Sequence, residues 1–251
     1  MSLIEHDLYL GKIDKVQNSI DLLRQFEPPD GYYLAYSGGK DSDCILELAK
    51  ISGVKFDAHY NLTTVDPPEL VWHVKTHPEV KVVRPKETMW QLIKRMRTPP
   101  TMLMRYCCRI LKEQGGNGRW VMTGIRKQES SKRAKRHEVE DCYKKKEESH
   151  YIHPIMYWTH DDVWEFIRSR NIPYCKLYDE GFKRLGCVMC PFGNRKRDME
   201  KFPRIAEAWH RAIIRYFNLQ TTQRGKCHTG EEFWQWWLSG KGKKEEGGLF
   251  T

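Results

Sequence analysis

The sequence predicts an α/β fold in which helices cover both faces of a mostly parallel sheet. Short apolar runs typical of strands alternate along the chain with segments whose apolar residues recur at helical spacing. A glycine-rich turn at residues 37–42 joins the first of these strands to a helix. Because parallel strands need crossover connections, this alternation favours a parallel sheet over an antiparallel one.

The expected elements begin with an amphipathic helix over residues 7–26, where apolar residues recur every three or four positions before Pro28 and Pro29. Strands follow at residues 32–36, 56–61, 80–83, 120–123 and 151–155. Helices are expected after the glycine-rich turn, after Pro68, at residues 89–96, after Thr159 and at residues 202–217. Ligands of such folds bind at the carboxyl ends of the strands, where the glycine-rich turn lies.

Three segments are expected to organise the chain: an N-terminal helix (residues 1–30), a central domain (31–200) and a C-terminal helical region (201–251). Residues 127–149 are polar and mostly charged, which is typical of a mobile loop or lid. Residues 230–237 carry four aromatic side chains, which are expected in the core or in a docking surface.

The chain has 251 residues, enough to bury a sizeable core, and a formal net charge of +10. The charge favours an anionic partner such as a nucleotide or a nucleic acid, and solvated surface lysines are the alternative. No apolar run approaches the roughly 20 residues that a membrane helix needs. Residues 1–30 also lack a signal-type apolar segment, so a cytoplasmic protein without membrane contact is expected.

The turn at residues 37–42 reads Ser-Gly-Gly-Lys-Asp-Ser. Gly38 and Gly39 let the backbone turn and approach a ligand closely, and amides at the start of a helix attract anions. Lys40 adds a cation beside these amides. The spacing differs from that of the Walker-type loop. The turn therefore predicts a phosphate site of another kind.

Of the eight cysteines, four form two close pairs. Cys107 and Cys108 are adjacent, and Cys187 and Cys190 lie in Gly-Cys-Val-Met-Cys-Pro. A disulfide framework is not expected in a cytoplasmic chain, whereas four thiolates can hold zinc or an iron–sulfur cluster. Adjacent cysteines chelate one tetrahedral ion awkwardly, while a cubane offers four separated iron corners, which favours [4Fe–4S] over zinc. Unrelated buried thiols are the remaining alternative.

The pattern S-G-G-x-D-S at residues 37–42 resembles the PP-loop of ATP pyrophosphatases. Residues 124–133 resemble the G-x-R-x-x-[DE]-S-x-x-R segment of the PAPS reductase family. Further matching motifs are His-Pro-Ile at 153–155, Trp-Thr at 158–159, Asp-Val-Trp at 162–164, Ile-Pro at 172–173 and Leu-Tyr-Asp-Glu-Gly at 177–181. The likeness runs from about residue 33 to 191. The chain thus resembles the iron–sulfur-bearing branch of this family, which implies an adenine nucleotide α-hydrolase-like fold.

The resemblance implies an adenine nucleotide site that takes ATP or adenylyl sulfate together with Mg²⁺. Its residues would be Ser37, Gly38, Gly39, Lys40, Asp41, Ser42, Gly124, Arg126, Glu129 and Arg133. Asp41 is expected to face Mg²⁺ or to cap the helix, and Glu129 to hold one of the arginines, which would bind phosphate or sulfate oxygens. The resemblance also implies a [4Fe–4S] cluster on Cys107, Cys108, Cys187 and Cys190.

Two departures separate the chain from the reductases of that family. Their C-terminal Glu-Cys-Gly-Leu-His segment is missing, and the late cysteine here is Cys227, between Lys226 and His228. Cys227 is interpreted either as a thiol of lowered pKa or as an incidental surface cysteine. Residues 61–64 read Asn-Leu-Thr-Thr, where the reductases tend to carry Asp-Thr-Gly.

Three functions remain open. In the first, Lys40, Asp41 and Arg126 act on ATP in a sulfur-transferring ATP pyrophosphatase with a sulfur donor protein and a nucleic acid acceptor. Such a protein resembles the iron–sulfur component of DNA phosphorothioation systems. In the second, the protein reduces adenylyl sulfate or its 3′-phosphate to sulfite, with Cys227 as the nucleophile and a thiol as the reductant. In the third, it is a non-catalytic nucleotide and cluster sensor. The two departures favour the first.

Overall fold

The computed structural model describes residues 3–7, 11–142, 149–219 and 227–240. The chain divides into two compact units. Unit 1 comprises residues 1–60, 68–83 and 115–185, and unit 2 comprises residues 61–67, 84–114 and 186–251. The division into segments 1–30, 31–200 and 201–251 stays a prediction. Within the described part, no helix has both the length and the apolar character that crossing a bilayer requires.

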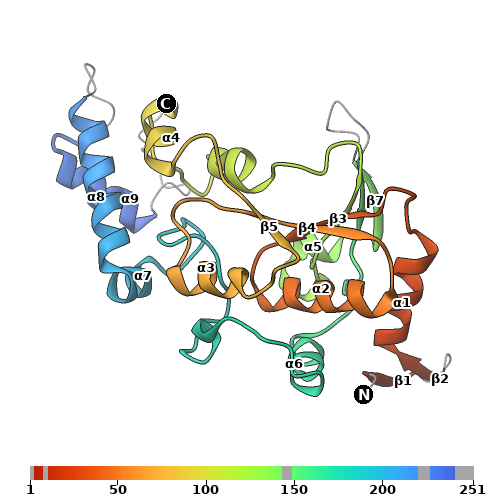
Figure 1. Cartoon of the computed structure of the whole chain (residues 1–251). Coiled ribbons are helices and arrows are strands. Elements are labelled where there is room, and N and C mark those ends of the chain that lie inside the picture. Colours follow the sequence, from red (N-terminus) through yellow and green to blue (C-terminus); the bar gives the residue numbers. More distant parts are fainter. Residues whose placement is uncertain (1–2, 8–10, 143–148, 220–226, 241–251) are drawn as a thin grey trace. The chain divides into compact units, whose positions relative to one another are not determined.

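Unit 1 is built on a six-stranded sheet of order β5-β4-β3-β6-β8-β7. Strands β3, β4, β5 and β7 of this sheet are labelled in Figure 1. The strands are β3 Tyr32–Tyr36, β4 Phe56–Asn61, β5 Val80–Val83, β6 Trp120–Met122, β7 Val139–Cys142 and β8 Ser149–Ile152. Strand β3 pairs in parallel with both β4 and β6, and β6 pairs in parallel with β8. The prediction of a mostly parallel sheet is therefore confirmed, and four of the five expected strands lie where the sequence placed them.

Helices α1 (Lys15–Gln25), α2 (Lys40–Ser52) and α6 (His160–Ser169) pack together in unit 1 (Figure 1). Helix α3 (Pro68–Lys75) belongs to the same unit. The core is apolar, because side chains of β3, α2 and α6 such as Leu34, Ile45 and Phe166 are completely buried. This packing fixes the end of β3 and the start of α2, which the glycine-rich turn connects.

Unit 2 is mainly helical. Its elements are α4 Met89–Met96, the π-helical turn η1 Cys108–Lys112, α7 Arg195–Lys201, α8 Pro203–Asn218 and α9 Gly230–Ser239. The rings of Trp209 and Trp237 stack with centroids 5.1 Å apart, and the Trp237 indole donates a 2.7 Å hydrogen bond to the carbonyl of Pro100. Three of the four aromatic residues of 230–237 are buried, so the prediction that they form core is confirmed for Phe233, Trp234 and Trp237.

The predicted helix over residues 7–26 is wrong in its first half. Strands β1 (Ile4–Asp7) and β2 (Gly11–Asp14) pair antiparallel, and the helix begins only at Lys15. The Asp14 carboxylate accepts hydrogen bonds of 3.0 Å from the amides of Val16 and Gln17, and this N-cap sets the start of the helix. Residues 8–10 lie outside the described part of the chain.

The predicted loop or lid over residues 127–149 is also wrong in part. It contains the short turns η2 (Lys127–Glu129) and α5 (Ser131–Ala134), and strand β7, which pairs antiparallel with β8. The expected strand at 151–155 accordingly begins earlier, at Ser149. Because β7 is an edge strand, it tolerates the charged residues that made this segment look like a loop. Residues 143–148 lie outside the described part.

Candidate functional site

The glycine-rich turn of unit 1 has the predicted strand–turn–helix geometry. Strand β3 ends at Tyr36, and α2 begins at Lys40 with Gly39 as its N-cap residue. Gly38 has a φ of +72°, and a Cβ atom there would lie 2.7 Å from Leu70 Cδ1 and 2.9 Å from Val74 Cγ2. Only glycine fits this position without strain, since it combines a left-handed backbone with contact to α3.

Hydroxyl groups fix the turn from within. Ser42 donates a 2.7 Å hydrogen bond to the carbonyl of Gly39, and the Ser37 and Ser42 hydroxyls lie 3.2 Å apart. The amide of Lys40 donates a 3.0 Å hydrogen bond to the hydroxyl of Tyr178. The turn is therefore ordered by its own side chains and by one tyrosine from a distant part of unit 1.

Two buried cations meet on one carboxylate at the start of α2. Lys40 and Arg126 are each only 4% exposed. Lys40 Nζ lies 2.9 Å from Asp41 Oδ2, and Arg126 Nε lies 2.6 Å from Asp41 Oδ1. The alternative that Asp41 caps the helix is wrong, because Asp41 lies inside α2 and its carboxylate binds these two cations. A phosphate group could replace Asp41 as their partner.

The segment after β6 supports this arrangement. A Cβ atom on Gly124 would lie 2.8 Å from the carbonyl oxygen of Asp41, so a glycine is needed where this segment meets α2. Glu129 accepts a 3.0 Å hydrogen bond from the amide of Arg126 and pairs with the guanidinium of Arg133. Glu129 thus makes the contact expected of a residue that holds an arginine in place.

Tyr178 and His160 also belong to this region, although neither was predicted as a site residue from the sequence. Lys40 Nζ lies 5.9 Å from the centroid of the Tyr178 ring, within cation–π range. Burial lowers the pKa of His160, and the charges of Lys40 and Arg126 lower it further. Tyr178 lies in the segment Leu-Tyr-Asp-Glu-Gly, which carried the family resemblance and was the available signal for it.

In unit 2 the four paired cysteines influence one another electrostatically. A hydrogen bond to Cys108 raises the pKa of the Cys107 thiol, and burial and the charges of Cys187 and Cys190 raise it further. The hydrogen bond from Cys107, together with the guanidinium of Arg105, lowers the pKa of Cys108 to about 6. The other three thiols of the set therefore all act on the pKa of Cys107.

Backbone contacts hold the loop that carries the second pair. The amide of Val188 donates a 2.8 Å hydrogen bond to the carbonyl of Val65. The amide of Met189 donates a 2.7 Å hydrogen bond to Asp198 Oδ2, and Met189 has a φ of +62°. The Cys187 thiol lies 3.4 Å from Thr63 Oγ1. The loop thus presents both cysteines through an uncommon backbone conformation.

Lys112 is a cation whose pKa responds to the charges of this cysteine set. Burial alone would lower its pKa, but the charges of Cys187, Asp66 and Cys190 raise the pKa above its usual range. Four thiolates around an iron–sulfur cluster carry net negative charge, and Lys112 and Arg105 are placed to offset it. The donor set and its surroundings therefore fit such a cluster.

A comparison of the whole sequence with protein-family models matches residues 31–192 to the phosphoadenosine phosphosulfate reductase domain. The chain belongs to this family. The matched range includes the glycine-rich turn, the segment of Arg126 and all four paired cysteines.

Among curated relatives, the chain is 30% identical to the uncharacterized protein MJ0066 of Methanocaldococcus jannaschii, over 81% of this chain and 45% of that protein. It is 36% identical to an adenosine 5′-phosphosulfate reductase of Oceanobacillus iheyensis, over 34% of this chain and 36% of that protein. A similar reductase of Staphylococcus haemolyticus is 26% identical over 64% of this chain and 70% of its own length. The chain thus spans less than half of the first two relatives.

Solved structures agree on the fold. The phosphoadenylyl-sulfate reductase of Candida auris in a phosphate complex matches with a TM-score of 0.54 and 18% identity, over 69% of this chain and 89% of that chain. A variant of the FMN adenylyltransferase of Candida glabrata matches with a TM-score of 0.50 and 14% identity, over 92% of this chain and 72% of that chain. At such low identities these likenesses establish the architecture alone.

Cys227 does not have the properties expected of a reactive thiol in this family. Its side chain is buried, and burial together with the charge of Glu232 raises its pKa. Burial thus contradicts the interpretation as a surface cysteine, and the raised pKa contradicts the interpretation as a thiol of lowered pKa.

Proposed function

We propose that the protein binds ATP at residues 37–42 and splits it to AMP and pyrophosphate during sulfur transfer. The observation that carries this proposal is the pair of buried cations, Lys40 and Arg126, that converge on Asp41 at the start of α2. Buried cations at a helix N-terminus stabilise the charge that develops on a phosphate group as a P–O bond breaks.

Each residue of the loop then has a role in binding. The amides of Gly38 and Gly39 and the hydroxyls of Ser37 and Ser42 contact phosphate oxygens. Lys40, Arg126 and Arg133 offset the negative charge of the nucleotide. When Lys40 and Arg126 pair with the phosphates, the carboxylate of Asp41 becomes available to Mg²⁺. Carboxylate and phosphate oxygens are ligands that Mg²⁺ prefers.

The reaction would run in two displacements. An oxygen of the acceptor attacks the α-phosphorus of ATP, and pyrophosphate leaves with the electron pair of the broken P–O bond. A reduced sulfur nucleophile, supplied by a donor protein or a thiol, then displaces AMP from the adenylated acceptor. The net charge of +10 supports a nucleic acid as that acceptor.

The four cysteines of unit 2 would hold a [4Fe–4S] cluster, with Lys112 and Arg105 offsetting its charge. Such a cluster supplies one-electron chemistry and iron sites that bind sulfur. Cys107, Cys108, Cys187 and Cys190 are its ligands in this proposal.

The test is release of pyrophosphate from ATP and Mg²⁺, with and without nucleic acid. We expect Lys40→Ala to weaken ATP binding, measured by calorimetry, by about 1–3 kcal/mol, the range for charge-assisted hydrogen bonds. Lys55→Ala serves as the control, because Lys55 is exposed and belongs to the same unit. Equal affinities of both variants for ATP would contradict the role of Lys40, and wild-type protein that never releases pyrophosphate would contradict the reaction.

A second candidate is reduction of adenylyl sulfate to sulfite, because relatives in Oceanobacillus and Staphylococcus are named adenosine 5′-phosphosulfate reductases. The buried Cys227 with its raised pKa counts against this candidate. Sulfite formation from adenylyl sulfate and a thiol, abolished by Cys227→Ala, would favour it over the first.

A further inference from the structure

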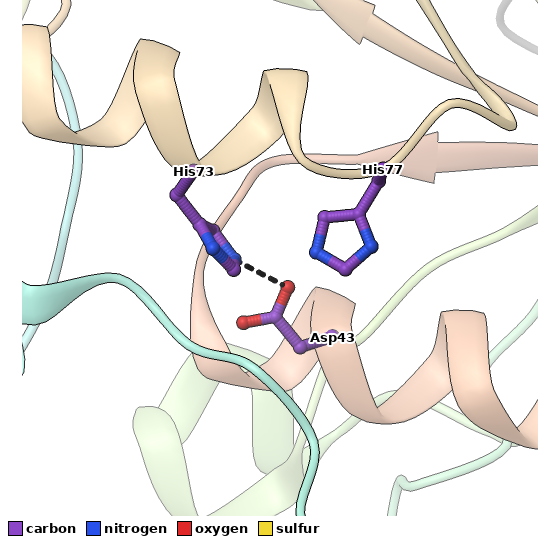
Figure 2. Close-up of side chains that lie close together, drawn as sticks. All are labelled: Asp43, His73 and His77. Carbon is purple, nitrogen blue, oxygen red and sulfur yellow. Dashed lines mark hydrogen bonds and ion pairs between the residues drawn. The ribbon is translucent and has the colours of Figure 1, made fainter.

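Three buried side chains of unit 1 meet at a place that no role described so far uses. They are Asp43 on α2, His73 on α3 and His77 just after α3 (Figure 2). One ligand atom from each lies within 4.8 Å of the others. Asp43 is 1% exposed, and the two histidines are 7% and 8% exposed.

The hydrogen bonds of this trio are incomplete. Asp43 Oδ1 accepts a 2.5 Å hydrogen bond from the Tyr36 hydroxyl and lies 3.0 Å from His73 Nε2. Asp43 Oδ2 and His77 Nε2 are both buried and have no hydrogen-bond partner among the residues that the structure describes. A buried carboxylate oxygen and a buried imidazole nitrogen without partners are costly. One cation bound between them would satisfy both.

The orientation of His77 fits a ligand. Figure 2 shows one of its ring nitrogens turned toward Asp43 and His73. The other, Nδ1, lies 3.9 Å from Glu79 Oε1. This carboxylate is too far away for a hydrogen bond, but it lies on the side from which a carboxylate usually supports a metal-bound histidine.

A cavity of unit 1 is lined by two members of the trio. Asp43 and His77 line it together with Glu47, Lys50 and Arg170. Both cations at this cavity are paired, since Arg170 lies 3.0 Å from Glu47 and Lys50 contacts Glu79. The cavity thus offers a metal ion a route inward and leaves room for a water ligand.

We propose that Asp43, His73 and His77 bind one divalent transition-metal ion of the zinc class, with water as a further ligand. Two imidazole nitrogens and one carboxylate oxygen suit Zn²⁺ or Co²⁺, whereas Mg²⁺ prefers oxygen ligands alone. The site is distinct from the four cysteines of unit 2, which offer only sulfur.

The experiment is a Co²⁺ titration of the full chain after removal of bound metal with a chelator. Cobalt on the cysteines gives strong thiolate charge-transfer absorption, whereas cobalt on nitrogen and oxygen ligands gives only weak visible bands. We expect wild-type protein to show the weak visible bands of one Co²⁺ ion per chain that is bound by nitrogen and oxygen ligands. Zn²⁺ should displace this cobalt, and a large excess of Mg²⁺ should not.

The variants His77→Ala and Asp43→Asn should weaken this binding at least tenfold and leave the thiolate absorption unchanged. The matched control is His59→Asn, because His59 pairs with Asp57 and stacks on Tyr33 away from the three proposed ligands. This variant should still bind one Co²⁺ through nitrogen and oxygen ligands. Circular dichroism checks that each variant is folded. The proposal is overturned if the wild type shows thiolate absorption only. It is also overturned if folded His77→Ala still binds one Co²⁺ through nitrogen and oxygen ligands. If a variant does not fold, the wild-type spectrum decides.

Discussion

The glycine-rich turn of unit 1 and the cysteine loop of unit 2 are held in place in different ways. The turn lies between β3, which pairs with strands on both sides, and α2, a helix of 13 residues. Its buried cations already have a partner in Asp41. The cysteine loop is held instead by amide hydrogen bonds to the Val65 carbonyl and the Asp198 carboxylate, and by the contact of Cys187 with Thr63. Met189 in this loop has a left-handed backbone.

This difference indicates how each region depends on its ligand. Regular secondary structure forms the phosphate loop before any anion arrives, so ligand binding there adds stability to a site that is already ordered. The cysteine loop joins thiols whose charges repel one another when ionised. We therefore expect a bound metal group to supply much of the stability of that loop.

The largest expected effect follows from replacing a cysteine ligand. Protein purified without oxygen should be brown, and Cys187→Ser should lose the visible absorption and lower the melting temperature. Cys227→Ser is the control, because Cys227 is a buried cysteine of the same unit outside the set of four. A colourless wild-type protein that holds one zinc ion per chain would contradict the cluster.

A glycine substitution tests the rigidity of the phosphate loop. Gly38→Ala places a Cβ atom 2.7 Å from Leu70 Cδ1 at a φ of +72°, so it adds overpacking to left-handed strain. We expect a loss of about 3 kcal/mol in the free energy of unfolding by urea.

Gly53→Ala is the matched control for Gly38→Ala. Gly53 has a φ of +75°, but a Cβ atom there meets nothing within 4 Å. Only the backbone strain of about 1 kcal/mol is expected. If both variants lose the same free energy of unfolding, the close contact of Gly38 with α3 does not add to the cost of the substitution.

The sequence predicted what depends on local pattern. The strand–turn–helix unit around Gly38 is contiguous in the chain, and its residue types dictate its geometry. Strand β7 was missed because an edge strand can be charged, and its pairing with β8 is not visible in its own residues. The start of α1 was predicted too early, because the helical spacing of apolar residues begins before Asp14. In the structure the helix begins only after the Asp14 N-cap.

Residue spacing in the sequence could not predict the long-range contacts that complete the sites. Tyr178 bonds the amide of Lys40 across 138 positions, and Asp43 meets His73 across 30. Such pairs form only when the sheet brings distant elements together. Motif reasoning therefore found the loop residues and the cysteines, but not the trio Asp43, His73 and His77.

The smallest expected effect concerns the frame behind the phosphate loop. Helix α6 packs on α2, and Asp162 completes its N-terminal cap by accepting a 2.7 Å hydrogen bond from the amide of Thr159. Lys15 Nζ lies 2.8 Å from the same carboxylate. Burial opposes these contacts but does not outweigh them, so the pKa of Asp162 is lowered.

A lowered pKa fixes the direction of the pH dependence. The stability that Asp162 contributes is fully present above the ordinary carboxyl pKa of about 4 and is lost as pH falls through the lower value of the folded state. Asp162→Asn should cost about 0.5–1 kcal/mol at pH 7, since the carboxylate is partly exposed, and almost nothing in strong acid. Urea unfolding at several pH values measures this, with Asp161→Asn as the neighbouring control. A cost that stays constant with pH would show that the amide substitution disturbs packing rather than charge, and that unit 1 needs no ion pair to hold α6 against α2.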